Sequence, residues 1–73
     1  MKRHEIEIVT EYIKLQDLLK FATLVSTGGE AKVLIQEGAV SVNDEICTQR
    51  GKKIRPGDKV QLADIVLTVK YAD

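Results

Sequence analysis

The stretch "TGGEAKVLIQEGAVSVND", residues 27–44, decides the fold because it joins a helix pattern to a hairpin pattern. Thr27 and Glu30 form a capping box, in which the hydroxyl accepts the Glu30 backbone N–H and the carboxylate reaches back to the Thr27 N–H. Apolar residues then recur at the spacing i, i+3, i+4 of one helix face: Ala31, Leu34 and Ile35. Gly38 supplies the left-handed residue that ends a helix. We therefore predict a short helix between Thr27 and Gly38.

The second half of the same stretch predicts a β-hairpin. "AVSV" at residues 39–42 is a short run rich in valine, and "EIC" at residues 45–47 provides the returning strand. Asn43 and Asp44 lie between them, and both residue types tolerate the positive φ angles of a tight turn.

On the N-terminal side, a strand and a further helix are expected. "EIEIVTEYI" begins at Glu5 and alternates charged with β-branched residues, which predicts a half-buried strand over residues 5–12. A helix of about ten residues follows, because leucines and an alanine share one face at helical spacing. The residues of this apolar stripe are Leu15, Leu18, Leu19 and Ala22. We expect Leu19 and Leu34 to lie in the core between the two helices and the sheet.

On the C-terminal side, the pattern is β. Pro56, Gly57 and Asp58 predict a turn. "KVQL" at 59–62 and "IVLTVKY" at 65–71 predict two more strands around a turn at residues 63–64. The predicted class is α+β, with two short helices packed on one face of a small, mostly antiparallel sheet. A chain of 73 residues can build one hydrophobic core, so we expect a single domain over residues 1–73.

Charge is distributed unevenly along a chain whose formal net charge is zero. Residues 1–45 carry five Lys or Arg and eight Asp or Glu, a net charge of −3, whereas residues 46–62 carry five Lys or Arg and one Asp, a net charge of +4. Residues 63–73 return to −1. Such asymmetry is typical of a binding face, although a charge run can equally be a solvated loop.

Several classes of function find no support in the sequence. His4 is the only histidine and Cys47 the only cysteine, so the usual four-ligand zinc site and a Ser-His-acid or Cys-His arrangement are not expected. Cys47 alternates with Ile46 in a predicted strand and is interpreted as a packing residue. We expect no catalytic activity, no metal, no cofactor and no small-molecule substrate. The sequence shows neither a signal peptide nor a membrane span, which favours a cytoplasmic protein without a membrane partner.

The ordered set "LLK…TGGEAKVLIQEGAVSVND…RGKKIRPGD" resembles the RNA-binding domain named after ribosomal protein S-four. That family runs from a Leu-rich helix through a second helix of the form A-x-x-L-I-x-x-G-x-V-x-V-N to a basic excursion and a Gly-Asp turn. The matching residues are Ala31, Leu34, Ile35, Gly38, Val40, Val42, Asn43, Gly57 and Asp58. The resemblance covers roughly residues 13–62, with flanking strands at 5–12 and 65–71, and is greatest to the stand-alone bacterial YaaA/YbcJ-type members.

This resemblance implies the αL motif of that family and binding to structured RNA, above all ribosomal RNA or a ribosomal subunit. A lone domain of this kind would act in ribosome assembly or maturation. The resemblance and the charge pattern assign RNA binding to Lys20, Thr27, Gly28, Gly29, Lys32, Arg50, Lys52 and Lys53. The family usually places Ser-Arg where this chain has Thr27-Gly28, so an arginine is missing there. Backbone N–H groups at Gly28 and Gly29 could meet phosphate, or the pair could be a plain turn between helices.

A protein-interaction adaptor is the alternative function. Zero net charge and the missing arginine at Gly28 favour it, as does an acidic N-terminal strand containing Glu5, Glu7 and Glu11. Such a strand could recruit a partner by strand addition at an exposed sheet edge.

Overall fold

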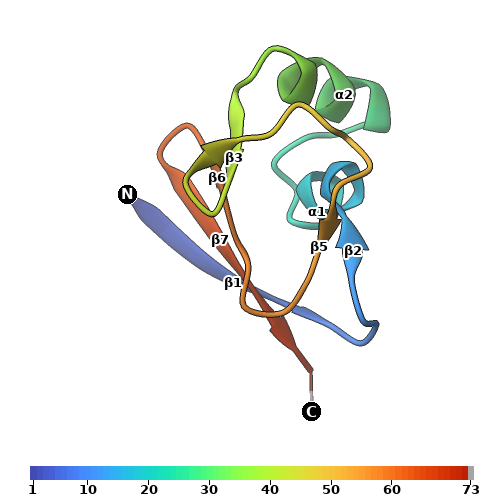
Figure 1. Cartoon of the computed structure of the whole chain (residues 1–73), viewed down its shortest axis with the longest axis vertical. Helices are drawn as coiled ribbons and strands as arrows, with labels where there is room; N and C mark the ends of the chain where they lie inside the picture. The colour runs from blue at the N-terminus through green and yellow to red at the C-terminus, as the bar shows by residue number, and fades with distance from the viewer. Residues whose placement is uncertain (73) are drawn as a thin grey trace.

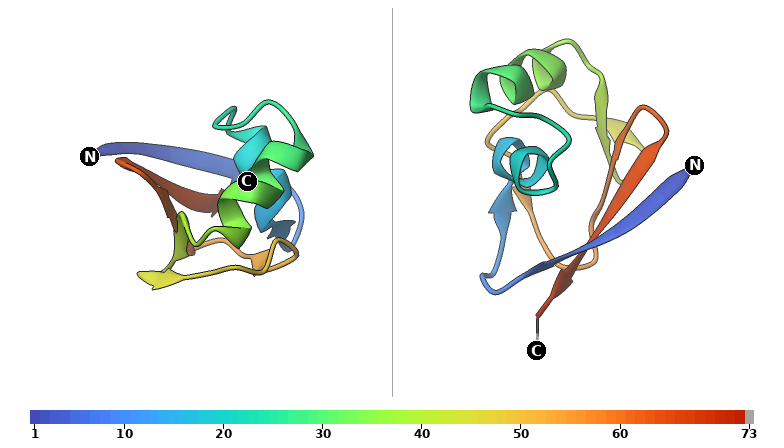
Figure 2. Two further views of the ribbon diagram at one scale, coloured as in Figure 1. Left: turned by 90° about the horizontal axis from the view of Figure 1, so that it is seen from above. Right: turned by 180° about the vertical axis from the view of Figure 1, so that it is seen from behind.

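A computed structural model describes residues 1–72; Asp73, the last position of the expected domain, lies outside the described residues. The helices lie to one side of a twisted sheet (Figures 1 and 2). The elements in chain order are β1 (Lys2–Ile8), β2 (Ile13–Lys14), α1 (Leu15–Phe21), α2 (Gly28–Gln36), β3 (Val40–Val42), β4 (Glu45–Ile46), β5 (Lys53–Ile54), β6 (Lys59–Leu62) and β7 (Ile65–Tyr71). The predicted α+β class is confirmed. No helix in this part of the chain is long and apolar enough to cross a membrane.

Five strands form the main sheet in the order β1-β7-β6-β3-β4. Three of its four pairings are antiparallel, and β1 joins β7 in parallel, from Lys2 opposite Ile65 to Ile8 opposite Tyr71. Strands β2 and β5 form a separate two-stranded sheet. The prediction of a mostly antiparallel sheet is therefore confirmed, with a parallel strand added at one edge.

The core lies between the helices and one face of the main sheet. Val60 of β6 lies opposite both Val42 of β3 and Leu67 of β7, so these three side chains share the inner face. Alternate residues of a strand point to the same side of the sheet. All three side chains are buried, because this side faces the helices. The helices and the neighbouring strands complete the cluster with Ile8, Leu15, Leu18, Leu19, Val25, Ala31, Ile35, Val40, Ile54 and Val69.

Helix α1 begins with an unusual cap. Lys14 at the N-cap provides no side-chain hydrogen bond. The loop before β5 provides acceptors for the free backbone N–H groups of the first turn instead. Leu15 N–H donates to the Lys52 carbonyl at 2.9 Å, and Gln16 N–H donates to the Arg50 carbonyl at 3.1 Å. The helix has seven residues rather than the predicted ten or so, and Ala22 is its C-cap.

Helix α2 buries Ala31 and Ile35 completely, but Leu34 is only partly buried and packs against the edge of the core. The prediction that Leu34 is a core residue is therefore only partly right, whereas Leu19 is fully buried as predicted. Residues 31 and 35 are four positions apart and lie almost one above the other, so Leu34 falls to the side of that line.

The first strand differs most from the sequence prediction. It was expected over residues 5–12, but β1 begins at Lys2 and ends at Ile8. The charged start is held in the sheet by its partner, since β7 offers backbone groups along its whole length from Ile65 to Tyr71. Residues 9–11 bend away instead, and the Thr10 hydroxyl donates to the Tyr12 carbonyl at 2.8 Å.

Truncation of the two leucines tests this packing. We expect Leu19→Ala to lower the free energy of unfolding by about 2–5 kcal/mol, because it opens a cavity in a fully packed core. We expect Leu34→Ala to lower it by about half as much, because part of that side chain already contacts water. Urea unfolding, analysed with the same m-value for both variants, measures the two losses in free energy of unfolding. Equal losses would contradict the observed orientation of α2.

Candidate nucleic-acid interface

The basic loop, residues 50–53, is fixed at both of its ends. Its carbonyl groups at Arg50 and Lys52 cap α1, as described above, and Ile54 directly after it is completely buried. The side chains of Arg50, Lys52 and Lys53 are nevertheless exposed. The backbone is therefore anchored while the cationic groups face solvent, which is the arrangement a phosphate-binding segment needs.

Lys53 has two neighbours that local sequence patterns did not predict. Its ammonium group lies 4.9 Å from the centre of the Tyr12 ring, within the range of a cation–π interaction. In addition, Lys14 lies directly opposite Lys53 in the β2–β5 pair, and both side chains are exposed. Like charges placed directly opposite each other in an antiparallel pair are destabilising unless a counter-charge relieves them. Lys14 therefore joins the candidate interface, although no local sequence pattern singles it out.

A pair of side chains, here called the Asn43–Asp58 clip, closes the segment that carries the basic loop. Asn43 Nδ2 donates to Asp58 Oδ1 at 3.1 Å, and Lys59 N–H donates to Asn43 Oδ1 at 3.0 Å. The second carboxylate oxygen, Asp58 Oδ2, accepts the Arg55 N–H at 2.8 Å. The predicted turns are confirmed here, since Asn43, Asp44 and Gly57 all have positive φ. The clip thus joins the β3–β4 turn to the turn at Gly57.

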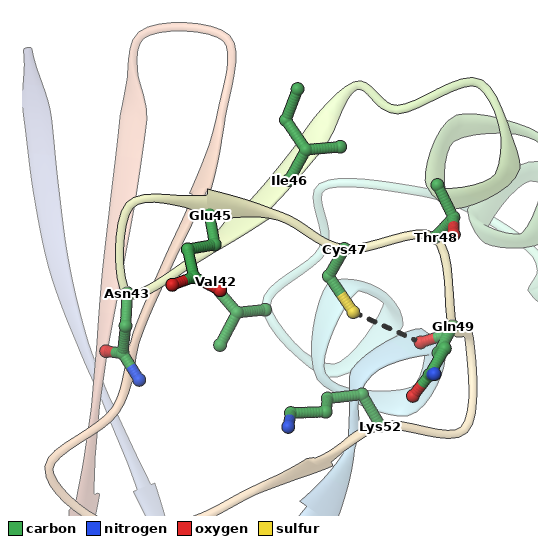
Figure 3. A pocket seen from close by; sticks show the side chains of 8 residues that line it. All are labelled: Val42, Asn43, Glu45, Ile46, Cys47, Thr48, Gln49 and Lys52. Atoms are coloured by element: carbon green, nitrogen blue, oxygen red, sulfur yellow. Dashed lines mark hydrogen bonds between the residues drawn. The ribbon is translucent and has the colours of Figure 1, made fainter.

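A hollow of about 440 Å³ lies between β4 and the basic loop. Its lining includes Asn43, Glu45, Gln49 and Lys52, and Figure 3 shows the Lys52 side chain extending across its lower side. Cys47 is partly buried against the core, and its Sγ lies 3.7 Å from the Gln49 carbonyl oxygen. These contacts support the interpretation of Cys47 as a packing residue.

The start of α2 confirms the predicted N-cap. The Glu30 N–H donates to Thr27 Oγ1 at 3.2 Å. The returning bond differs from the prediction, because Glu30 Oε1 accepts the N–H of Ser26 rather than that of Thr27, at 3.1 Å. Gly28 and Gly29 follow on the exposed surface, and a Cβ added at Gly28 would meet no atom within 4 Å. Neither glycine has the positive φ found at Gly38 and Gly57, so backbone conformation does not explain the pair.

The structure places the eight predicted site residues in two groups of three and at two single positions, Lys20 and Lys32, all of them exposed. Arg50, Lys52 and Lys53 belong to the basic loop, while Thr27, Gly28 and Gly29 lie together at the start of α2. Lys20 is in the last turn of α1, whereas the basic loop bonds to its first residues. A separation of five residues along a helix is a rise of about 7.5 Å, so Lys20 lies at the other end of α1 from the loop. Lys32 follows the buried Ala31 on the outside of α2.

This structure belongs to a class of α+β domain with two packed helices. In this domain the Asn43–Asp58 clip closes the segment that carries the basic loop, and the side chains of that loop are exposed. Residues 6–70 match the S4 domain, and the chain belongs to this family. It is 44% identical over 57 residues to a protein from Bacillus subtilis strain 168 named "Probable ribosome maturation protein RlbA"; the match covers 78% of this chain and 80% of that protein.

The fold is also similar to a solved structure described as "Crystal structure of pseudouridylate synthase". The TM-score is 0.69 and the sequence identity is 25%. The match covers 77% of this chain but only 24% of the synthase chain. The likeness is therefore to one part of a larger protein.

The Asn43–Asp58 clip can be tested by a double-mutant cycle. Asn43→Gly removes the side chain while keeping a residue that tolerates positive φ, and Asp58→Ala removes the carboxylate. We expect each change to lower the free energy of unfolding by about 1–2 kcal/mol, because backbone and side-chain donors lose their acceptors. The double variant is expected to lose less than the sum of the two, since both changes break the same bond. Strict additivity in chemical denaturation would show that the two side chains do not act together.

The N-cap can be tested at Thr27. We expect Thr27→Ala to lower the free energy of unfolding by about 1 kcal/mol, because the Glu30 N–H loses its acceptor. Thr27→Ser keeps the hydroxyl and is the matched control, with stability close to that of the unmodified protein. Equal thermal stability of the alanine and serine variants would contradict the capping role.

Proposed function

We propose that this chain is a non-catalytic protein that binds structured ribosomal RNA and takes part in ribosome maturation in the cytoplasm. The observation that carries the proposal is the basic loop, whose backbone is bonded to α1 while its three cationic side chains are exposed. Membership of the S4 domain family supports RNA as the ligand. The name of the Bacillus subtilis relative supports a role in ribosome maturation.

The pairing of Lys14 with Lys53 supports an anionic ligand at this place. Two lysines held opposite each other repel, and a phosphate between them would turn this repulsion into attraction for both. The Tyr12 ring holds the Lys53 ammonium on the protein while leaving it exposed. Both observations support the proposal that a phosphate of a folded RNA backbone binds between Lys14 and Lys53.

The start of α2 offers a second contact of the same kind. The first turn of a helix has free N–H groups that favour anions, and the exposed Gly28 and Gly29 leave room for a backbone to approach them. Several contacts to phosphates along a folded RNA backbone suit the recognition of structured RNA by its shape. A platform for stacked single-stranded bases is less favoured, because aromatic residues are limited to Tyr12, Phe21 and Tyr71.

A charge-reversal experiment tests the proposal. The variant Arg50→Glu, Lys52→Glu and Lys53→Glu is titrated with purified large-subunit ribosomal RNA and with oligouridine as an unstructured control. We expect the unmodified protein to prefer the structured RNA and to lose affinity steeply with salt, because bound phosphates release counterions. We expect the triple variant to lose most of this binding, and the salt dependence to fall by about one unit of log–log slope for each phosphate contact removed.

The matched control reverses three other charges, at Lys2, Arg3 and Lys59, so that both variants have the same net charge. Arg3 and Lys59 line a different hollow, on the outer face of the main sheet. This control is expected to retain a larger share of the binding and to co-sediment with ribosomal subunits. Equal losses in both triple variants would show that net charge alone is responsible and would reject the basic loop as the binding site.

A further inference from the structure

An apolar groove lies where β1 ends and α1 passes it, and it belongs to none of the RNA-binding groups above. It has a volume of about 450 Å³ and is lined by residues 7–10 together with Ile13, Asp17 and Phe21. Ile8 at this place is almost completely buried and belongs to the core cluster. The groove is thus an opening of the hydrophobic core onto the surface.

The apolar side chains at this groove are unusually exposed. Phe21, one of only three aromatic residues in the chain, is 61% exposed, and Val9 is 75% exposed. Because both side chains are exposed, the folded chain keeps apolar surface in contact with water. Apolar surface of this kind gathered around a hollow is typical of a place where another molecule binds.

The charged residues in the lining are both acidic, Glu7 from β1 and Asp17 from the first turn of α1. Within residues 1–72, neither carboxylate lies within 4.0 Å of a cationic group; Lys70 lies opposite Glu7 in the parallel pair, but its Nζ forms an ion pair with Glu5 at 3.3 Å. A negative rim repels RNA phosphates and anionic lipid headgroups, and it attracts lysine and arginine. The sign of the charge at this groove is therefore opposite to that of the basic loop.

The geometry also separates this groove from Lys14 and the basic loop. Ile13 lines the groove and Lys14 stands opposite Lys53, and successive residues of a strand point to opposite sides. A ligand at Ile13 therefore approaches β2 from the side away from Lys14. In addition, β1 is an edge strand of the main sheet, so its outer backbone groups are available to an extended chain.

We propose that this groove binds a lysine- or arginine-rich protein segment, which inserts an apolar side chain against Phe21 and Val9 and places its cationic residues on Glu7 and Asp17. The charge complementarity selects a basic protein segment over nucleic acid and membrane. The proposal goes beyond RNA binding and does not depend on it, because it uses none of the residues assigned to RNA. The chain would then hold RNA on one side and a basic protein segment on the other.

The test uses a fluorescein-labelled peptide of eight residues, with Leu-Phe at its centre and three lysines on each side. Two matched peptides replace Leu-Phe with Ser-Gly, or all six lysines with glutamates. We expect fluorescence anisotropy with the full chain to show that only the basic peptide with the apolar centre binds, and that binding weakens with added salt. Equal binding of the Ser-Gly peptide, or binding of the acidic peptide, would overturn the proposal.

Variants of the protein locate the binding. We expect Phe21→Ser and Val9→Ser each to weaken peptide binding by about tenfold, as truncation of a buried apolar contact at an interface does. Val33→Ser is the matched control, because Val33 is 53% exposed but lies on α2 outside the groove. Glu7→Gln combined with Asp17→Asn is expected to remove most of the salt dependence, whereas Glu37→Gln leaves it unchanged. If both Phe21→Ser and Val9→Ser keep the peptide affinity of the unmodified protein, the groove is rejected as the binding site.

Two further measurements separate this proposal from its alternatives. RNA titration of Phe21→Ser is expected to match that of the unmodified protein, so failure of the RNA proposal and failure of the groove proposal give different results. Sedimentation equilibrium of the unmodified protein is expected to show a monomer. A dimer that disappears in Phe21→Ser and Val9→Ser would assign the groove to a second copy of the chain and overturn the proposal.

Discussion

The functional part of this structure depends on the closure of the segment between β3 and β6, where the hydrogen bond between Asn43 and Asp58 adds to the backbone pairing of Val42 with Val60. Asn43 and Asp58 lie fifteen positions apart, and the chain between them contains β4, the basic loop and β5. Because the ends of this segment are joined, its middle has little freedom and can cap α1 with the carbonyl groups of Arg50 and Lys52. The position of the basic loop therefore depends in part on an amide and a carboxylate that lie outside it.

The sequence predicted the elements that short-range patterns specify. The capping hydroxyl of Thr27, the left-handed Gly38 and the turn at Asn43 and Asp44 depend on residues within a few positions, and the structure confirms them. The basic loop was also recognisable as a candidate site, because its charges are adjacent in sequence, whereas the separation of Lys20 from this loop was not. The family resemblance gave the expected ligand of this loop.

The features that the sequence missed depend on residues far apart in the chain. The extent of β1 is set by its pairing with β7, and the two short strands β2 and β5 exist because residues 13–14 meet residues 53–54. The opposition of Lys14 and Lys53, the contact of Lys53 with Tyr12 and the Asn43–Asp58 clip follow from the same tertiary arrangement. No local period or spacing encodes these contacts. The partial exposure of Leu34 was missed for a related reason, since the stripe of a helix does not specify how far the sheet extends beneath it.

Charges of opposite sign gather at two places in a chain whose net charge is zero. The basic loop concentrates positive charge near the start of α1, while Glu7 and Asp17 place negative charge at the groove beside β1. A protein of this kind can attract a polyanion and a polycation at once while its total charge stays balanced. The proposed RNA binding and the proposed binding of a basic protein segment would therefore be compatible, because they would use different residues of the chain.

The parallel pairing of β1 with β7 has a consequence for the order in which the surfaces form. This pairing joins the first strand to the last, from Lys2 opposite Ile65 onward, and closing so long a loop is entropically slow. The Asn43–Asp58 clip closes a much shorter loop and can form while β1 is still detached. The clip can thus close before the first strand is paired, whereas Ile8 at the groove reaches its place in the sheet through its pairing with Tyr71. A molecule that binds the groove would therefore favour chains in which β1 has paired with β7.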